Sequence, residues 1–260
     1  MLRELNTQLR TWWQTHIVNT HTGPPLQWQP ALILCAATVL LTLFFYYGKS
    51  GWWYRSGLDD PARAALPQAW ETYFDLLPFV WWGVQSILMR VVVPCFLIAW
   101  IYRESPLKHG LGLGDSHKHV PIYLGLYLFM LPFLIWASTL ASFQENYPFY
   151  ERAGASPTHF LLFESFYAMQ FIGVEFFFRG FLLFTLFRVF GWYSLLIAAI
   201  PYVMIHFNKP IPETLGALVA GTILGYLALR TRSIWPGVLL HGGIALTMDV
   251  LAMWQKGAWG

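Results

Sequence analysis

Charged and ionisable side chains interrupt the apolar segments in the C-terminal half of this chain, and their types suit acid–base chemistry. Glu175 and Arg179 stand four residues apart in an aromatic run, so they lie on the same face of a helix. His206 and His241 interrupt two later apolar segments. Each of these groups needs a partner in a medium of low dielectric constant, and they can satisfy one another. We therefore expect Glu175, His206 and His241 to share one polar site.

Two kinds of hydrolytic chemistry use these three side chains. In the first, Glu175 is a general base that takes a proton from a water molecule held by His206, while His241 stabilises the developing oxyanion, and no cofactor is required. In the second, the three residues are the ligands of a zinc ion whose fourth position holds the water. The spacing of the residues leaves both open, together with a purely structural Glu175–Arg179 ion pair. The chain has no His-Glu-x-x-His and no Gly-x-Ser-x-Gly, which excludes a standard soluble metalloprotease helix and the usual serine elbow.

Four further residues are candidates for supporting roles around this site. Arg179 is expected to keep Glu175 ionised through the effect of the opposite charge. Tyr202 precedes His206 by one helical turn, Asn208 follows it by two residues, and Asp249 follows His241 by two turns.

The expected depth of each residue in its span leaves open whether His241 or Asp249 is the partner of Glu175. Measured from the expected start of the last span, Asp249 lies about 22 Å deep and His241 only about 10 Å, whereas Glu175 lies roughly 18 Å deep on its own span. Either the last span begins deeper, as Pro236 and Gly237 permit, or Asp249 is the residue that meets Glu175.

The composition shows what kind of elements must position these residues. The 260 residues are 57% hydrophobic and only 11% charged, with a mean hydropathy of +0.48, whereas soluble domains are about 25% charged. The chain is therefore expected to be an integral membrane protein with the lipid bilayer as a partner. A net charge of +3 is too small to indicate a nucleic-acid partner.

The expected fold is all-α, a polytopic transmembrane helical bundle of about seven spans with interfacial helices. Each expected span approaches the roughly 20 residues that cross a bilayer. The spans are Ala31–Tyr47, Leu77–Tyr102, Pro121–Ser142, Phe160–Phe187, Trp192–His206, Leu215–Leu229 and Trp235–Trp254.

We divide the chain into three parts. Residues 1–28 form an amphipathic interfacial segment, in which apolar residues recur at helical spacing as far as His16; residues 29–159 form N-terminal transmembrane helices and loops; residues 160–256 form the transmembrane core that carries the site. Arg90, within the second span, is expected to play a structural part by snorkelling or by pairing with a carboxylate. The distribution of Lys and Arg among the loops places the N-terminus in the cytoplasm.

From about residue 110 to 250 the chain resembles the CPBP or ABI family of intramembrane proteases, which includes the eukaryotic enzyme that trims CAAX proteins after prenylation. The family pattern is Glu-Glu-x-x-x-Arg, Phe-x-x-x-His and His-x-x-x-Asn on successive helices. Here the corresponding stretches are Val174-Glu175-x-x-x-Arg179, Tyr202-x-x-x-His206 and His241-x-x-x-Ala245. Flanking motifs such as Gly112-Leu-Gly-Asp115 are similar to those of bacterial members, which implies a bacterial inner membrane.

The resemblance implies an endopeptidase that hydrolyses a peptide bond of a membrane-anchored protein or peptide. Two departures bear on this activity: Val174 replaces the first Glu of the pattern, and Ala245 replaces its Asn. Glu175 must then serve both as the partner of Arg179 and as the base. Alternatively, the chain is a non-catalytic relative that binds a membrane-anchored partner, for example in peptide export or bacteriocin immunity.

Overall fold

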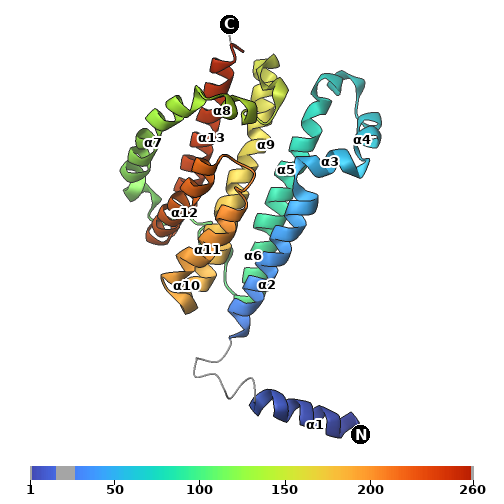
Figure 1. Ribbon diagram of the computed structural model, residues 1–260, viewed down its shortest axis with the longest axis vertical. Coiled ribbons are helices and arrows are strands. Elements are labelled where there is room, and N and C mark those ends of the chain that lie inside the picture. Colours follow the sequence, from blue (N-terminus) through green and yellow to red (C-terminus); the bar gives the residue numbers. More distant parts are fainter. Residues whose placement is uncertain (1, 16–26, 259–260) are drawn as a thin grey trace.

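The computed structural model describes residues 2–15 and 27–258, and every regular element in these two ranges is helical (Figure 1). The predicted all-α fold is confirmed. In chain order the elements are α1 (Leu2–Trp13), α2 (Trp28–Leu43), η2 (Phe44–Gly48), α3 (Ser50–Ser56), α4 (Asp59–Ala65), η3 (Gln68–Leu76), α5 (Leu77–Ile87), η4 (Leu88–Val92), α6 (Val93–Tyr102), η5 (Pro106–His109), α7 (Ser116–Ser138), α8 (Ala141–Asn146), η6 (Glu151–Ala155), α9 (Pro157–Glu175), η7 (Phe176–Leu183), α10 (Phe184–Phe190), α11 (Tyr193–Met204), α12 (Ile211–Thr231) and α13 (Trp235–Gln255). The segments η2, η4 and η7 are π-helical, and η3, η5 and η6 are 3₁₀-helical.

Five helical stretches are long and apolar enough to cross a membrane, so the chain is an integral membrane protein. They are Trp28–Gly48, Gln68–Tyr102, Ser116–Ser138, Ile211–Thr231 and Trp235–Gln255. The other two predicted spans are also helical. Residues 160–187 lie inside a continuous rod formed by α9, η7 and α10, and residues 192–206 correspond to α11, which has only 12 residues.

The third predicted span is displaced along the chain. Helix α7 begins at Ser116 and ends at Ser138, and the chain then turns at Thr139 and Leu140 before the short helix α8. The hydrophobic run alone therefore gave the wrong end for this helix.

The N-terminal helix α1 lies at the lower end of the molecule in Figure 1, apart from the packed helices. Its side chains Leu5, Leu9, Trp12 and Trp13 are exposed. The location of segment 1–28 at a membrane interface stays a prediction, and His16 lies outside the described residues.

The rod formed by α9, η7 and α10 is the centre of the bundle. It contacts α5, α11 and α13, and α13 in turn packs on α7. The segment η7 is apolar around its whole circumference apart from Arg179, and such a helix is stable only when neighbours surround it. Accordingly Phe176, Phe177 and Phe181 have no exposed surface. The α5–α9 contact is close because Gly173 faces Ser86, and a Cβ atom at Gly173 would lie 2.2 Å from the Ser86 hydroxyl oxygen.

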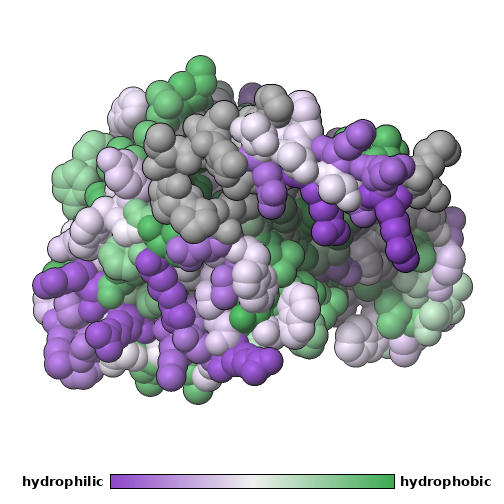
Figure 2. Space-filling view, turned by 90° about the horizontal axis from the view of Figure 1, so that it is seen from below, coloured by the Kyte–Doolittle hydropathy of each residue, from purple (hydrophilic) through white to green (hydrophobic). Residues whose placement is uncertain are grey.

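The loops at the lower end of the bundle are joined to one another by hydrogen bonds. The Asp115 amide donates to the Thr231 carbonyl at 2.8 Å, and the Ile234 amide donates to the Gly110 carbonyl at 2.9 Å. Arg188, at the end of α10, donates to Glu104 at 2.8 Å. Seen from this end, hydrophilic side chains gather in patches, with hydrophobic side chains on the flanks (Figure 2).

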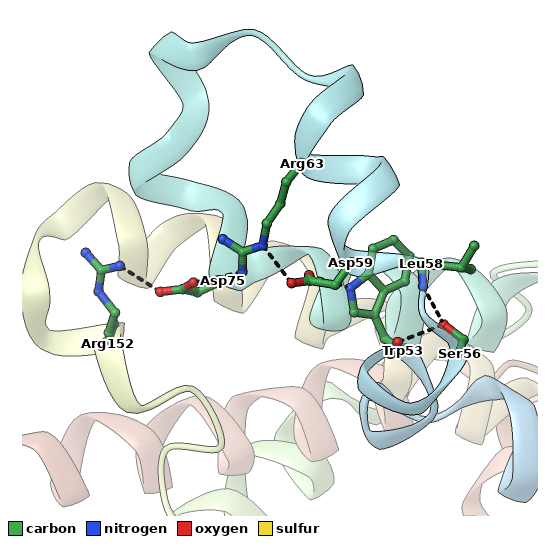
Figure 3. Close-up of polar contacts among 7 residues, drawn as sticks. All are labelled: Trp53, Ser56, Leu58, Asp59, Arg63, Asp75 and Arg152. Carbon is green, nitrogen blue, oxygen red and sulfur yellow. Dashed lines mark hydrogen bonds and ion pairs between the residues drawn. The ribbon is translucent and has the colours of Figure 1, made fainter.

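A polar network joins the elements of the opposite end (Figure 3). Arg63 contacts Asp59 at 2.7 Å and Asp75 at 3.3 Å, and Arg152 contacts the second oxygen of Asp75 at 2.7 Å. The Trp53 indole also donates to Asp59 at 2.9 Å. The network connects α3, α4, η3 and η6, and it engages Asp75 with two arginines.

Candidate active site

Glu175 is the last residue of α9, and its carboxylate lies at the contact between α9 and α13. Its side chain is 1% exposed, and its Oε1 atom lies 2.9 Å from Nδ1 of His241 and 3.3 Å from Nη1 of Arg179. Because a carboxylate oxygen accepts hydrogen bonds, the proton of His241 is assigned to Nδ1. The Nε2 atom of a neutral His241 is then an acceptor.

Arg179 lies one turn after Glu175 within the π-helical segment η7 and is buried. Its guanidinium carbon stands 4.2 Å from the centre of the Tyr202 ring. Neither Nη atom makes a well-aligned hydrogen bond within residues 2–15 and 27–258. The Glu175–Arg179 pair is therefore held by charge and by packing on Tyr202, without the two parallel hydrogen bonds of a bidentate pair.

His206 lies in the turn that follows α11 inside the bundle. Its Nδ1 atom donates to the Tyr202 carbonyl at 2.8 Å, and its own carbonyl accepts the hydroxyl proton of Thr214 at 2.7 Å. These two bonds hold the turn from both sides. They leave the Nε2 atom of His206 as an acceptor in the neutral ring.

Tyr202 joins the components of the site. Its ring centre lies 4.8 Å from the ring of His206 and 6.4 Å from the ring of His241. The Phe171 ring covers His241 from another side at 4.8 Å. These rings form one cluster with Glu175 and Arg179, although the residues come from α9, η7, α11, the turn after α11, and α13.

A cavity of about 1040 Å³ opens onto this cluster. His206, His241, Phe171 and Val174 line it, whereas Glu175 does not. The His241 side chain is 22% exposed. A molecule in the cavity can therefore touch the two imidazoles, and it reaches Glu175 only through His241.

Two predicted supporting residues lie outside the cluster. Asn208 is exposed on the wall of the cavity, and among the hydrogen bonds of the described residues none joins its side chain to His206 or His241. Asp249 is completely buried beside Glu164, and both of its carboxylate oxygens lack a hydrogen-bond partner among the described atoms. His241, and not Asp249, is the neighbour of Glu175.

Gly237 explains why His241 is the residue that meets Glu175. A Cβ atom at this position would lie 2.9 Å from Oε2 of Glu175. The first turn of α13 can therefore lie directly against the carboxylate, and His241 follows one turn later on the same face. The sequence did not indicate that Gly237 contacts Glu175; it showed only that Pro236 and Gly237 permit a deeper start of the last span.

A second set of residues holds the turn after His206. Lys209 contacts Glu213 and the Tyr147 hydroxyl, each at 2.6 Å, and that hydroxyl donates to Glu213 at 2.9 Å. Burial raises the pKa of Tyr147, which keeps the hydroxyl protonated and able to donate. These residues couple the start of α12 to the segment before α9.

The arrangement of donor atoms does not match a zinc site. Within the two described ranges no three His, Cys, Asp or Glu side chains converge as metal ligands do. Among the described residues the Nε2 atoms of both histidines are free, as they are in histidines that bind zinc, but Glu175 does not join them as a third ligand. Its Oε1 atom is shared between His241 and Arg179, and Glu175 does not line the cavity.

The contacts of Arg90 differ from the two that were predicted for it. It neither snorkels out of the bundle nor pairs with a carboxylate within the described ranges. Its side chain is 5% exposed, its Nη1 atom donates to the amide oxygen of Gln170 at 3.2 Å, and its guanidinium lies 3.6 Å from the centre of the Phe44 ring. It also lines the cavity.

Residues 156–247 match the family model described as type II CAAX prenyl endopeptidase Rce1-like. The matched segment includes Glu175, Arg179, His206 and His241 and ends before Asp249. It is of the CPBP or CAAX protease family, and the resemblance predicted from the motifs is confirmed there. Comparison with curated proteins and with solved structures gave no match.

Proposed function

We propose, from the match of residues 156–247 to CAAX prenyl endopeptidases, that this membrane protein hydrolyses a peptide bond of a membrane-anchored protein or peptide. The observation that carries the proposal is the contact between Glu175 and His241 beneath the cavity that holds His206. No cofactor takes part.

The proposed mechanism assigns the base to the Glu175–His241 pair, because Glu175 itself does not face the cavity. Nε2 of His241 takes a proton from a water molecule, whose oxygen attacks the peptide carbonyl carbon. Glu175 stabilises the imidazolium that forms, and Arg179 compensates the charge of Glu175. Nε2 of His206 accepts the second hydrogen of the water and orients it.

The second half of the reaction uses the same proton. The protonated Nε2 of His241 faces the tetrahedral oxyanion and then protonates the leaving nitrogen as the C–N bond breaks. The immediate products are a carboxylic acid, which keeps the second hydrogen of the water, and an amine, and transfer of that hydrogen between them gives a carboxylate and an ammonium group. In this scheme His241 carries out both the transfer of the proton and the stabilisation of the oxyanion, which the motif pattern assigned to separate residues.

A non-catalytic peptide-binding protein is the second candidate, and a specific observation favours it. Val174, at the place of the first Glu of the family pattern, lines the cavity, so the position that faces a bound molecule carries no carboxylate. The site would then hold a membrane-anchored peptide without cutting it.

The test uses purified protein in proteoliposomes and an internally quenched, S-prenylated CAAX peptide. We expect Glu175→Gln and His241→Gln each to lower kcat by about 100-fold or more, the usual contribution of a general base. Glu145→Gln, which changes an exposed carboxylate on α8, is the matched control. Equal losses in the two variants support the pair as the base, whereas a much smaller loss in His241→Gln supports direct proton transfer to Glu175.

Three other results contradict the proposal. Full activity of Glu175→Gln would show that Glu175 is not part of the general base. Loss of activity with 1,10-phenanthroline that returns with added zinc supports the zinc version of the reaction. Binding of the peptide by the unaltered protein without any cleavage supports the non-catalytic candidate.

A further inference from the structure

Arg90 carries a positive charge that no acidic side chain in residues 2–15 and 27–258 neutralises. It makes one hydrogen bond, to the neutral amide of Gln170, and one contact with the Phe44 ring. Its Nε atom is buried and has no hydrogen-bond partner among those residues. A cation in this state inside a membrane protein is unfavourable, and such residues generally mark a binding or transport site.

The backbone around Arg90 supports the same view. Arg90 lies in the π-helical segment η4, which interrupts the rod formed by α5 and α6. Short π-helical stretches within α-helices occur frequently at functional sites. The other arginine held in a π-helical segment is Arg179, in the candidate active site.

The surroundings of Arg90 favour an anion. Among the ionised side chains that line the cavity, four are basic, namely Lys49, Arg90, Arg152 and Lys209, and two are acidic, namely Asp75 and Glu151. Asp75 is engaged by Arg63 and Arg152, and Lys209 is engaged by Glu213, so Lys49 and Arg90 are the two cavity cations without an ion pair among the described residues. Lys49 and Arg90 both line the cavity. Burial lowers the pKa of Lys49, and the positive charge of Arg90 lowers it further.

The depth of Arg90 decides which anion can reach it. Arg90 is near the middle of the helical rod Leu77–Tyr102, roughly 18 Å from either end at about 1.5 Å per residue. The hydrocarbon core of a bilayer is about 30 Å thick, so lipid phosphates stay near the ends of such a rod. An anion arrives at Arg90 through the cavity, together with the molecule that the cavity binds.

We propose that Arg90 binds the C-terminal carboxylate of the peptide in the cavity and thereby positions the scissile bond at His241. The inference rests on the proposed function. Gln170, the partner of Arg90, precedes Glu175 by five residues on α9, a rise of about 7.5 Å. Arg90 and His241 therefore contact α9 at points about 7.5 Å apart along its axis, and at about 3.3 Å per extended residue a peptide needs at least two residues to cover this axial component. Arg90 is thus a specificity-determining residue for substrates that end close to the cleaved bond.

The experiment compares two prenylated CAAX peptides that differ only at the C-terminus, one a free acid and one an amide. For the unaltered protein we expect kcat/KM for the acid to exceed that for the amide by about tenfold or more, which corresponds to about 1.4 kcal/mol. Arg90→Gln should remove this preference by lowering only the value for the acid. Arg55→Gln, which changes an exposed arginine that does not line the cavity, should keep it.

A binding measurement and a second variant of Arg90 complete the experiment. Binding of fluorescent acid and amide peptides to Glu175→Gln protein should show the same dependence on Arg90, which separates a failure of carboxylate binding from a failure of the proposed catalysis. Arg90→Lys keeps the charge if Arg90→Gln does not fold, and we expect it to retain part of the preference.

Equal rates for acid and amide in the unaltered protein overturn the proposal. A preference that persists in Arg90→Gln overturns the assignment to Arg90. If activity depends on anionic lipid and on Arg90 but does not differ between the two peptides, Arg90 binds a lipid phosphate and not the peptide carboxylate.

Discussion

The Nδ1 atom of His241 lies 2.9 Å from Oε1 of Glu175, although 66 positions separate the two residues in the chain. The same oxygen is 3.3 Å from Arg179. One buried carboxylate oxygen therefore faces a permanent cation on its own helical rod and an ionisable ring on α13. This arrangement differs from a simple structural ion pair, because the third partner reaches a cavity.

The contribution of the Glu175–Arg179 pair to stability can be distinguished from its contribution to cleavage by replacing both residues together. Arg179→Met removes the permanent cation beside the buried Glu175 and leaves it only the hydrogen bond from His241, and breaking a buried ion pair in this way destabilises proteins by about 3–5 kcal/mol. We expect a large fall in the thermal unfolding midpoint, measured in detergent. In Glu175→Met/Arg179→Met no charge remains unpaired, so stability should return while peptide cleavage stays absent. Recovery of cleavage in the double variant would reduce the pair to a structural role.

Gly237→Ala tests the close approach of α13 to the carboxylate. A methyl group at this position would stand 2.9 Å from Oε2 of Glu175, so the carboxylate must move away from His241. Displacement of a catalytic group by about 1 Å can lower a rate about 100-fold, and we expect kcat to fall by at least tenfold.

Gly243→Ala is the control for this substitution. The nearest atom to its added methyl group is a Tyr127 ring carbon at 3.8 Å, an ordinary contact. Both substitutions raise helix propensity equally within α13, so a difference between them reports on Glu175. Equal kinetics in the two variants would mean that Gly237 does not position the site.

Val174→Glu tests whether the position that faces the cavity limits activity. The side chain of Val174 lines the cavity, so a glutamate here brings a carboxylate to the water beside His206 and His241. We expect faster peptide cleavage, by about tenfold, or its appearance if the unaltered protein does not cut. Val174→Gln has the same shape without the charge and should give no gain. A gain in both variants would indicate that polarity alone, and not a base, is responsible.

The ion pair at the lower end of the bundle should make stability depend on pH below neutrality. Hydrogen bonds from Arg188 lower the pKa of Glu104 to about 2, and His109 contributes a further hydrogen bond at 3.1 Å. Because the folded state holds this carboxylate ionised, its stabilisation is complete above about pH 4.5, the ordinary pKa of Glu, and is lost as the pH falls toward 2.

Thermal unfolding between pH 6 and pH 3 measures this effect. Arg188→Gln should unfold at a lower temperature at pH 6 and show a smaller further decrease at pH 3 than the unaltered protein. Arg103→Gln, which changes an exposed arginine next to Glu104, should follow the unaltered protein at both values. If the unfolding temperature falls by the same amount from pH 6 to pH 3 in all three proteins, Glu104 is not the source of the pH dependence of stability.

The sequence by itself determined the class of the fold and most of the helices. An apolar run about as long as the hydrocarbon core of a bilayer must form an α-helix unless it belongs to a closed β-barrel. The reason is that every backbone N–H and C=O group inside the lipid needs a hydrogen-bond partner within the protein. The charged and ionisable residues that interrupt those runs were equally visible. Glu175, Arg179, His206 and His241 were identified in this way, and the segment that holds them matches a family model.

Only the tertiary structure decided which of these residues meet. His241 and Asp249 lie two turns apart on the same face of α13, so periodicity cannot choose between them as partners of Glu175. The choice depends on how deep α13 begins, and Gly237 sets this by allowing its first turn to touch the carboxylate. Val174 and Glu175 are neighbours in the chain, yet the rotation of α9 turns Val174 toward the cavity and Glu175 away from it. The contacts of Arg90 could not be predicted from the sequence because Phe44 and Gln170 belong to η2 and α9, far away along the chain, and neither element supplies a carboxylate that neutralises it.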